Sequence, residues 1–153
     1  MPIRFAIIAA TILVALAVAG ALRHSVPWTR STVATNEPIL RAQRTMRRHG
    51  LVVGVIEVGA LVALAIALFR VPAGSREMWL IGVAALCVAT MIGVWAAWLR
   101  PMNATIADWR TDELPSDWEE HHARWSRLHR VRVMLAALAL FLLLMTLFAR
   151  PAL

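Results

Sequence analysis

The sequence is poor in cysteine, in lysine and in charge of any kind. It contains one cysteine, Cys87, no lysine, and only 16% charged residues. A single cysteine excludes an intrachain disulfide and a paired-cysteine redox motif. All 16 basic residues are therefore arginines, which carry a permanent charge on a forked set of donors. Arginine without lysine, together with abundant alanine, indicates a GC-rich bacterial genome.

Most of the residues in the chain are apolar. The chain is 60% hydrophobic with a mean hydropathy of +0.67, which is typical of a membrane protein. A helix needs about 20 apolar residues to cross a bilayer. Four runs are long enough, at residues 3–22, 51–69, 79–99 and 131–148. We predict a single integral membrane domain over residues 1–153, with an all-α fold, built as a four-helix transmembrane bundle.

The first apolar run has an alternative interpretation as a secretory signal. Arg4 precedes it, and Ala17-Val18-Ala19 resembles a cleavage site. Its length favours a span, and cleavage would leave three spans with the arginine-rich loop on the unusual side of the membrane.

Arginine placement predicts the orientation in the membrane. Residues 23–50 hold six arginines and residues 100–130 hold five, whereas the connection 70–78 holds two and each terminus one. Arginine-rich loops stay in the cytoplasm. We predict the bacterial inner membrane, with both long loops cytoplasmic and both termini outside. The same arginines explain the net charge of +7, so we reject a nucleic-acid partner and expect membrane lipids instead.

Two of the four helices should extend beyond the membrane on the cytoplasmic side. Asn36 and Pro38 mark a helix start that continues through Gly50 into span two. Ser116, with Glu119 three residues later, predicts a capping box for a helix that ends near Phe148. Arg100-Pro101 is expected to end span three, and Asn103 to cap a short helix toward Trp109. Trp95, Trp98 and Met102 should share one face there.

The helix from Ser116 carries the best candidate site. Its members are spaced by 4, 3, 4 and 3 residues, which places them within one arc at about 100° per residue; they are Trp118, His122, Trp125, His129 and Arg132. One interpretation is an interfacial belt of aromatic and basic residues. The other is a pocket for a flat aromatic ligand, in which tryptophan stacks, His129 moves a proton and Arg132 stabilises an anionic oxygen.

Glu57 lies about two turns inside span two, where an ionisable residue indicates function. Its expected partners are Arg132 or His129. It is either a general base or half of a structural ion pair. A metal site formed by His24, His49, His129 and Glu57 is a further alternative, although no histidine pair at metal-ligand spacing supports it.

The order of motifs resembles a family of small four-span membrane proteins that includes the anthrone oxygenases. The first span ends in Gly20 and is followed by His24, Pro27 and Trp28, and an arginine-rich stretch leads from Arg41 to Gly50 into span two. The more specific part is a series of short motifs: Pro101-x-Asn103 with Ile106 and Trp109, Pro115-x-Asp117-Trp118, Arg124-Trp125, and His129-x-x-Arg132. Glu57 departs from the family pattern, because that region is usually apolar.

The resemblance implies oxidation of an anthrone to an anthraquinone by molecular oxygen, with no cofactor and no metal. For that chemistry the candidate catalytic residues are His129, Arg132 and Glu57, with His129 or alternatively Glu57 as the base. The candidate substrate-binding residues are Trp118, Trp125, His122, Trp28, His24 and Asn103. An apolar, flat substrate would reach them from the bilayer.

Two other function classes stay open from the sequence. The chain is alternatively a non-enzymatic membrane protein that binds lipid or accompanies a larger complex, with arginines holding anionic headgroups. It is alternatively a quinone- or metal-linked redox protein.

Overall fold

The computed structural model describes residues 3–24, 37–109 and 115–148, and these ranges contain helices and no strand. The elements are α1 (Ile3–His24), α3 (Glu37–Leu68), α4 (Arg76–Val94), the π-helical turn η1 (Trp95–Leu99), α5 (Arg100–Ala107) and α6 (Trp118–Phe148). The predicted all-α bundle is confirmed. The two extended helices, α3 and α6, begin well before their apolar segments, as the sequence indicated.

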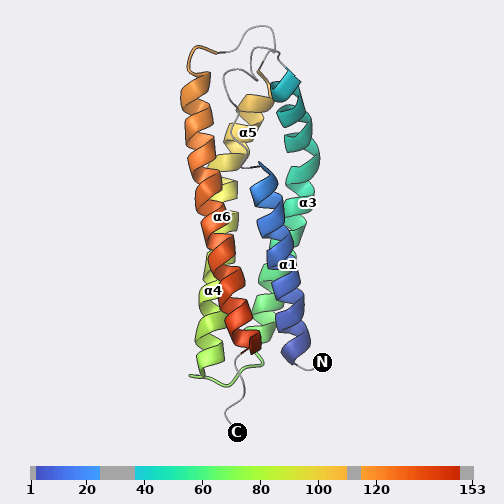
Figure 1. Cartoon of the computed structure of the whole chain (residues 1–153), viewed down its shortest axis with the longest axis vertical. Coiled ribbons are helices and arrows are strands. Elements are labelled where there is room, and N and C mark those ends of the chain that lie inside the picture. The colour runs from blue at the N-terminus through green and yellow to red at the C-terminus, as the bar shows by residue number, and fades with distance from the viewer. Residues whose placement is uncertain (1–2, 25–36, 110–114, 149–153) are drawn as a thin grey trace.

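Four long helices form a closed ring. α1 packs against α3, α3 against α4, α4 against α6, and α6 against α1 (Figure 1). α1 begins at the end of the bundle where α6 finishes, and α3 and α6 both begin at the opposite end (Figure 1). At that opposite end α3 and α6 extend beyond α1, and α5 lies beside them (Figure 1).

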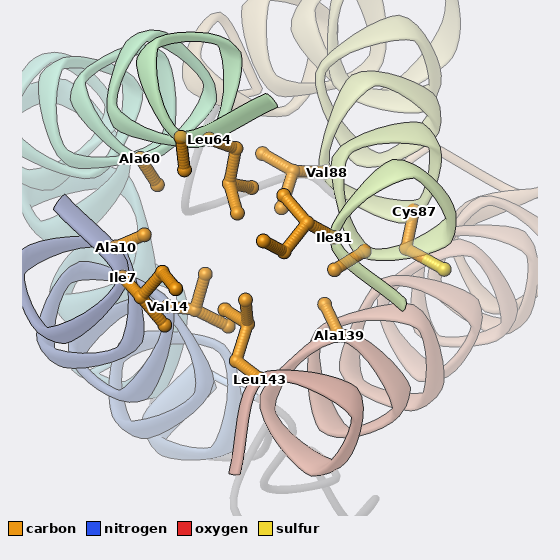
Figure 2. Packing of buried hydrophobic residues seen from close by; sticks show 12 residues of the cluster. Ile7, Ala10, Val14, Ala60, Leu64, Ile81, Cys87, Val88, Ala139 and Leu143 are labelled. Carbon is orange, nitrogen blue, oxygen red and sulfur yellow. The ribbon is translucent and has the colours of Figure 1, made fainter. Parts of the chain in front are cut away.

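The core of the ring is built from small and branched side chains. Ala10, Ala60, Ala84 and Ala139 are 0–1% exposed. They sit beside larger residues that point inward from each helix, such as Val14, Leu64, Ile81 and Leu143 (Figure 2). Alternation of small and large side chains lets helices pack closely without leaving voids.

The outside of the ring is apolar as well. The helical segments Arg76–Ala107 and Trp118–Phe148 are long and apolar enough to cross a bilayer, and α1 and α3 contain shorter apolar segments at Arg4–Gly20 and Val52–Leu68. Large apolar side chains are exposed along every long helix, from Phe5 to Leu22, from Val52 to Phe69, from Trp79 to Trp98 and from Val131 to Phe148. Each interval covers roughly 26–29 Å at about 1.5 Å per residue. The residues at which each of the four spans enters and leaves the membrane remain predictions.

The helix that carries span three does not end at Pro101. α4, η1 and α5 follow one another without a break, and the Arg100 N–H donates to the carbonyl of Trp95, five residues earlier. In a regular α-helix the ring of Pro101 would clash with the carbonyl four residues before it. The wider turn directly before Pro101 lets the helix continue. Asn103 therefore lies inside α5, and the prediction that it caps a new helix is wrong.

The π turn also changes which side chains share a face. Buried positions on α4 recur every three or four residues up to Val94, and the next is Leu99, five residues on. Trp98 is 47% exposed, whereas Trp95 and Met102 pack against the cluster that contains Leu99. The predicted shared face of Trp95, Trp98 and Met102 is therefore wrong, because it assumed an uninterrupted α-helix.

The α1–α3 contact predicts opposite effects at two neighbouring residues. A methyl group added at Gly59 would lie 3.6 Å from Leu13 Cδ1, an ordinary contact. Gly59→Ala should therefore raise the free energy of unfolding by about 0.5–1 kcal/mol, since glycine inside a helix is entropically costly. Ala60 is 1% exposed, so Ala60→Leu should lower it by about 1–3 kcal/mol through overpacking. Thermal unfolding in detergent measures both, and a lower melting temperature for Gly59→Ala would contradict this packing.

Candidate functional site

The arc on α6 points into the bundle. Neither glycine nor proline interrupts α6 between Trp118 and Phe148, so the helix holds its phase over the whole arc. Trp125 is 5% exposed, His129 7% and Arg132 4%, while Trp118 and His122 are partly buried nearer the start of the helix. An interfacial belt would leave these side chains on the outer surface. The arc instead descends from a half-exposed end to a buried one.

An ion pair closes the buried end of the arc. Arg132 Nη2 donates a hydrogen bond to Glu57 Oε1, which joins α6 to α3, and the two side chains are 5% and 3% exposed. Of the two partners expected for Glu57, the structure therefore selects Arg132. Arg132 Nε is buried and has no hydrogen-bond partner among the residues that the structure describes. A guanidinium in this position keeps one donor for an anionic atom while a carboxylate balances its charge.

Aromatic rings are layered above the ion pair. The ring centroids of Trp125 and His129 lie 4.0 Å apart at 54°. The ring of His122 is stacked over Trp125 at 6.5 Å and 18°, and Trp118 follows at 6.4 Å and 40°. Indole and imidazole planes therefore alternate along one face, an arrangement suited to a flat aromatic ligand.

Desolvation in this layered face lowers the pKa of the His122 imidazole, which lies in the polar first part of α6. His122 Nε2 is 3.5 Å from the hydroxyl oxygen of Ser126, one turn along the helix. A neutral imidazole is the form that stacks best in an apolar setting, because burial penalises the charged form.

A residue on α5 completes the site. The Trp125 indole Nε1–H donates to Asn103 Oδ1 at 2.9 Å. Around this contact lie apolar side chains from the last part of the α4–η1–α5 helix, including Val94, Leu99 and Ile106. The site is thus walled by three segments, α3, α5 and α6.

A second aromatic group lies next to the arc but does not belong to it. His121 Nε2 is 3.3 Å from Asp117 Oδ2, and its ring meets Trp109 edge-on at 5.9 Å. His121 and His122 are neighbours in the sequence, yet about 100° of helical rotation separates them. The pairing of His121 with Trp109 was not anticipated from the sequence, since the residues between the two helices give no periodic pattern. α6 also begins at Trp118, one residue later than a cap at Ser116 requires.

Several candidate residues lie wholly or partly outside the described structure. His24 is the last residue of α1, and His49 lies in α3, but the described side chains include neither. Trp28 falls outside the described ranges. Within those ranges no group of three or more histidine, cysteine, aspartate or glutamate residues could hold a metal ion. The proposed convergence of His24, His49, His129 and Glu57 is therefore untested.

Comparison with known proteins gives one match. Residues 42–142, which include Glu57, Asn103 and the whole arc on α6, match the profile of a family described as anthrone oxygenase. No curated protein and no solved structure matches the chain significantly.

The buried ion pair predicts a characteristic stability pattern. Glu57→Leu or Arg132→Met alone should lower the free energy of unfolding by about 3–5 kcal/mol, because each leaves one buried charge without its partner. Replacing both together, as Glu57→Leu with Arg132→Met, should recover most of that loss. Denaturant unfolding of the four proteins in detergent measures the pattern. Additive losses in the double variant would show that the two charges do not act as a pair.

His122 predicts a titration that depends on its ring neighbours. Its pKa should lie below the ordinary value of about 6.5 and should rise when Trp125→Ala admits water. Since the folded pKa is the lower one, the unfolded chain binds the proton first. The neutral imidazole therefore contributes stability that is lost as pH falls below about 6.5 through the folded pKa. NMR titration of histidine-labelled protein measures this, and an ordinary pKa in the wild type would contradict it.

Proposed function

The chain belongs to the anthrone oxygenase family, and from this premise we propose that it oxidises a flat phenolic ketone of the anthrone type with molecular oxygen inside a membrane. The observation that carries the proposal is the burial of His129 between the Trp125 ring and, one helical turn further, the Glu57–Arg132 pair. In this proposal His129 serves as proton acceptor, Arg132 as anion-stabilising donor and Trp125 as stacking surface, all within two turns of α6.

The reaction needs these three functions and no electron carrier. An anthrone has a CH2 group whose protons are acidic because the resulting anion is delocalised onto the ketone oxygen. His129 takes one proton, and the carbanion forms a C–O bond with O2. The peroxide oxygen takes up a proton, giving a hydroperoxide. Loss of the second C–H proton and cleavage of the O–O bond then give the new carbonyl and water. In sum, CH2 and O2 become C=O and H2O.

Arg132 is proposed to stabilise the anion that forms in the first step. Its Nε is the donor left over after the Nη2–Glu57 hydrogen bond. A preorganised donor in an apolar interior stabilises developing negative charge more than the same donor does in water. Glu57 then balances the charge of Arg132 and holds its guanidinium plane. Because Glu57 is engaged in this way, we keep His129 as the base in preference to Glu57, the alternative that the sequence offered.

The stacking face and the apolar outer surface support a role in binding within a membrane. Trp118 and His122 extend the stacking face beyond Trp125 toward the end of the bundle. The apolar belt on the outside of the ring has the height of a bilayer interior, about 30 Å. We place the site near the edge of this belt, at the end that carries both long connections. The positive-inside rule makes that end the cytoplasmic one in a bacterial inner membrane.

Oxygen uptake tests the proposal. Purified wild-type protein in detergent, given a hydroxyanthrone, should consume oxygen and form the quinone faster than the spontaneous reaction. His129→Ala should lower the enzymatic rate at least about 10²-fold, since it removes the base. His121→Ala is the matched control: it removes the adjacent histidine, whose partners are Asp117 and Trp109, and should leave the rate unchanged.

One result would contradict the oxygenase and another the assignment of its base. A wild-type rate equal to the spontaneous rate would favour a protein that binds lipid or accompanies a larger complex. Equal losses in His129→Ala and His121→Ala would show that the base is not specifically His129.

A further inference from the structure

We propose that Asn103 is a positioning residue that holds Trp125 in one orientation over His129, and that the π turn Trp95–Leu99 is the feature that places it there. The effect on turnover rests on the proposed function, whereas the geometry can be tested without any substrate. Neither Asn103 nor the π turn has a role in the proton transfer itself.

The hydrogen bond between the two side chains is directional. An indole nitrogen can only donate, so the amide of Asn103 must turn its carbonyl oxygen toward it. Trp125 is 5% exposed and packs among Val94, Leu99 and Ile106. If the indole turned over, its N–H would face these apolar side chains with no acceptor, which is unfavourable for a buried polar group. Asn103 therefore selects one of the two ring orientations that the space would otherwise allow.

The orientation of Trp125 determines the surroundings of His129. Their ring centroids are 4.0 Å apart at 54°, closer than the other ring pairs on α6. His129 is 7% exposed, and Trp125 is one of the side chains that cover it. A tilted or mobile indole would change both the position of the imidazole and the water that reaches it.

The π turn brings Asn103 to this position. Counting by α-helical periodicity from buried Val94 would turn Trp98, Met102 and Thr105 toward the bundle. The five-residue step from Val94 to Leu99 instead turns Leu99, Asn103 and Ile106 inward. One wide turn thus leaves Trp98 and Thr105 exposed and brings a hydrogen-bond acceptor opposite Trp125, while Met102 still packs against the Leu99 cluster. π turns are rare and occur frequently at functional sites.

NMR of protein without substrate tests the geometry. In ¹⁵N-tryptophan-labelled protein, the Trp125 indole resonance is the one lost in Trp125→Phe. Asn103→Leu, which keeps the shape but removes the acceptor, should shift that resonance and speed its hydrogen exchange at least tenfold. It should also move the ring-proton shifts of His129, since these feel the ring current of Trp125. Asn103→Asp keeps the acceptor oxygen and should retain both signals.

Thr105→Val is the matched control on the same helix. Thr105 is exposed, and its hydroxyl donates to the carbonyl of Pro101 at 3.2 Å. The Trp125 and His129 signals should be unchanged in this variant. Unchanged signals in Asn103→Leu would overturn the proposal, and so would equal changes in Asn103→Leu and Thr105→Val.

Turnover provides the second readout. If the wild type oxidises an anthrone, Asn103→Leu should lower kcat about tenfold with KM nearly unchanged, because misplacing a base affects the chemical step rather than binding. Asn103→Asp, which keeps the acceptor oxygen, should retain the wild-type kcat. An unchanged kcat alongside altered NMR signals would overturn the positioning role. If wild-type protein shows no turnover but the NMR pattern holds, the proposed function fails while the role of Asn103 in ordering Trp125 and His129 is supported.

Discussion

The arrangement of this bundle depends on one buried ion pair. Glu57 and Arg132 are each almost fully shielded from solvent, and neither could remain charged there without the other. Their contact links α3 to α6, which lie diagonally opposite each other in the ring, across the interior of the bundle. The other residues of the site are arranged along α6 relative to this ion pair. His129 lies one turn from Arg132, and the layered rings follow His129. An apolar pair of similar volume would pack as well, so the charges point to a use beyond stability.

A buried polar side chain in an apolar ring is costly unless a partner offsets the loss of hydration. Arg132 is balanced by Glu57, and Trp125 is matched by Asn103. The outer surface of the ring needs no such polar partners, because its exposed valine, leucine and phenylalanine side chains suit a lipid environment. The result is a bundle with an apolar exterior and a narrow polar line along the inner face of α6. In such a setting a single buried imidazole can act as a base, because little water competes for its proton or for the anion that forms.

Much of this arrangement could be predicted from the sequence, and the remainder had identifiable causes. The number of long helices and the common face of Trp125, His129 and Arg132 follow from length and α-helical periodicity, which packing did not disturb. The sequence narrowed the partner of Glu57 to two residues, but only the three-dimensional structure, in which Arg132 reaches Glu57 across the interior of the ring, selected Arg132. The π turn could not be predicted from periodicity, because the face expected for Trp95, Trp98 and Met102 assumes unbroken α-helical phase. Pro101 is the available signal, but a proline in a helical pattern more commonly indicates the end of a helix. The role of Asn103 depended on that same turn.

The most direct test of the account is anaerobic proton exchange. With oxygen excluded, wild-type protein in D2O should exchange the CH2 protons of a hydroxyanthrone faster than buffer does, since His129 removes and returns a proton while Arg132 stabilises the anion. Mass spectrometry of the recovered anthrone measures the exchange. In the presence of His129→Ala or Arg132→Met protein, the exchange should be no faster than in buffer alone. Exchange in wild-type protein at the buffer rate would contradict the claim that this buried pair and its histidine form a proton-abstraction site.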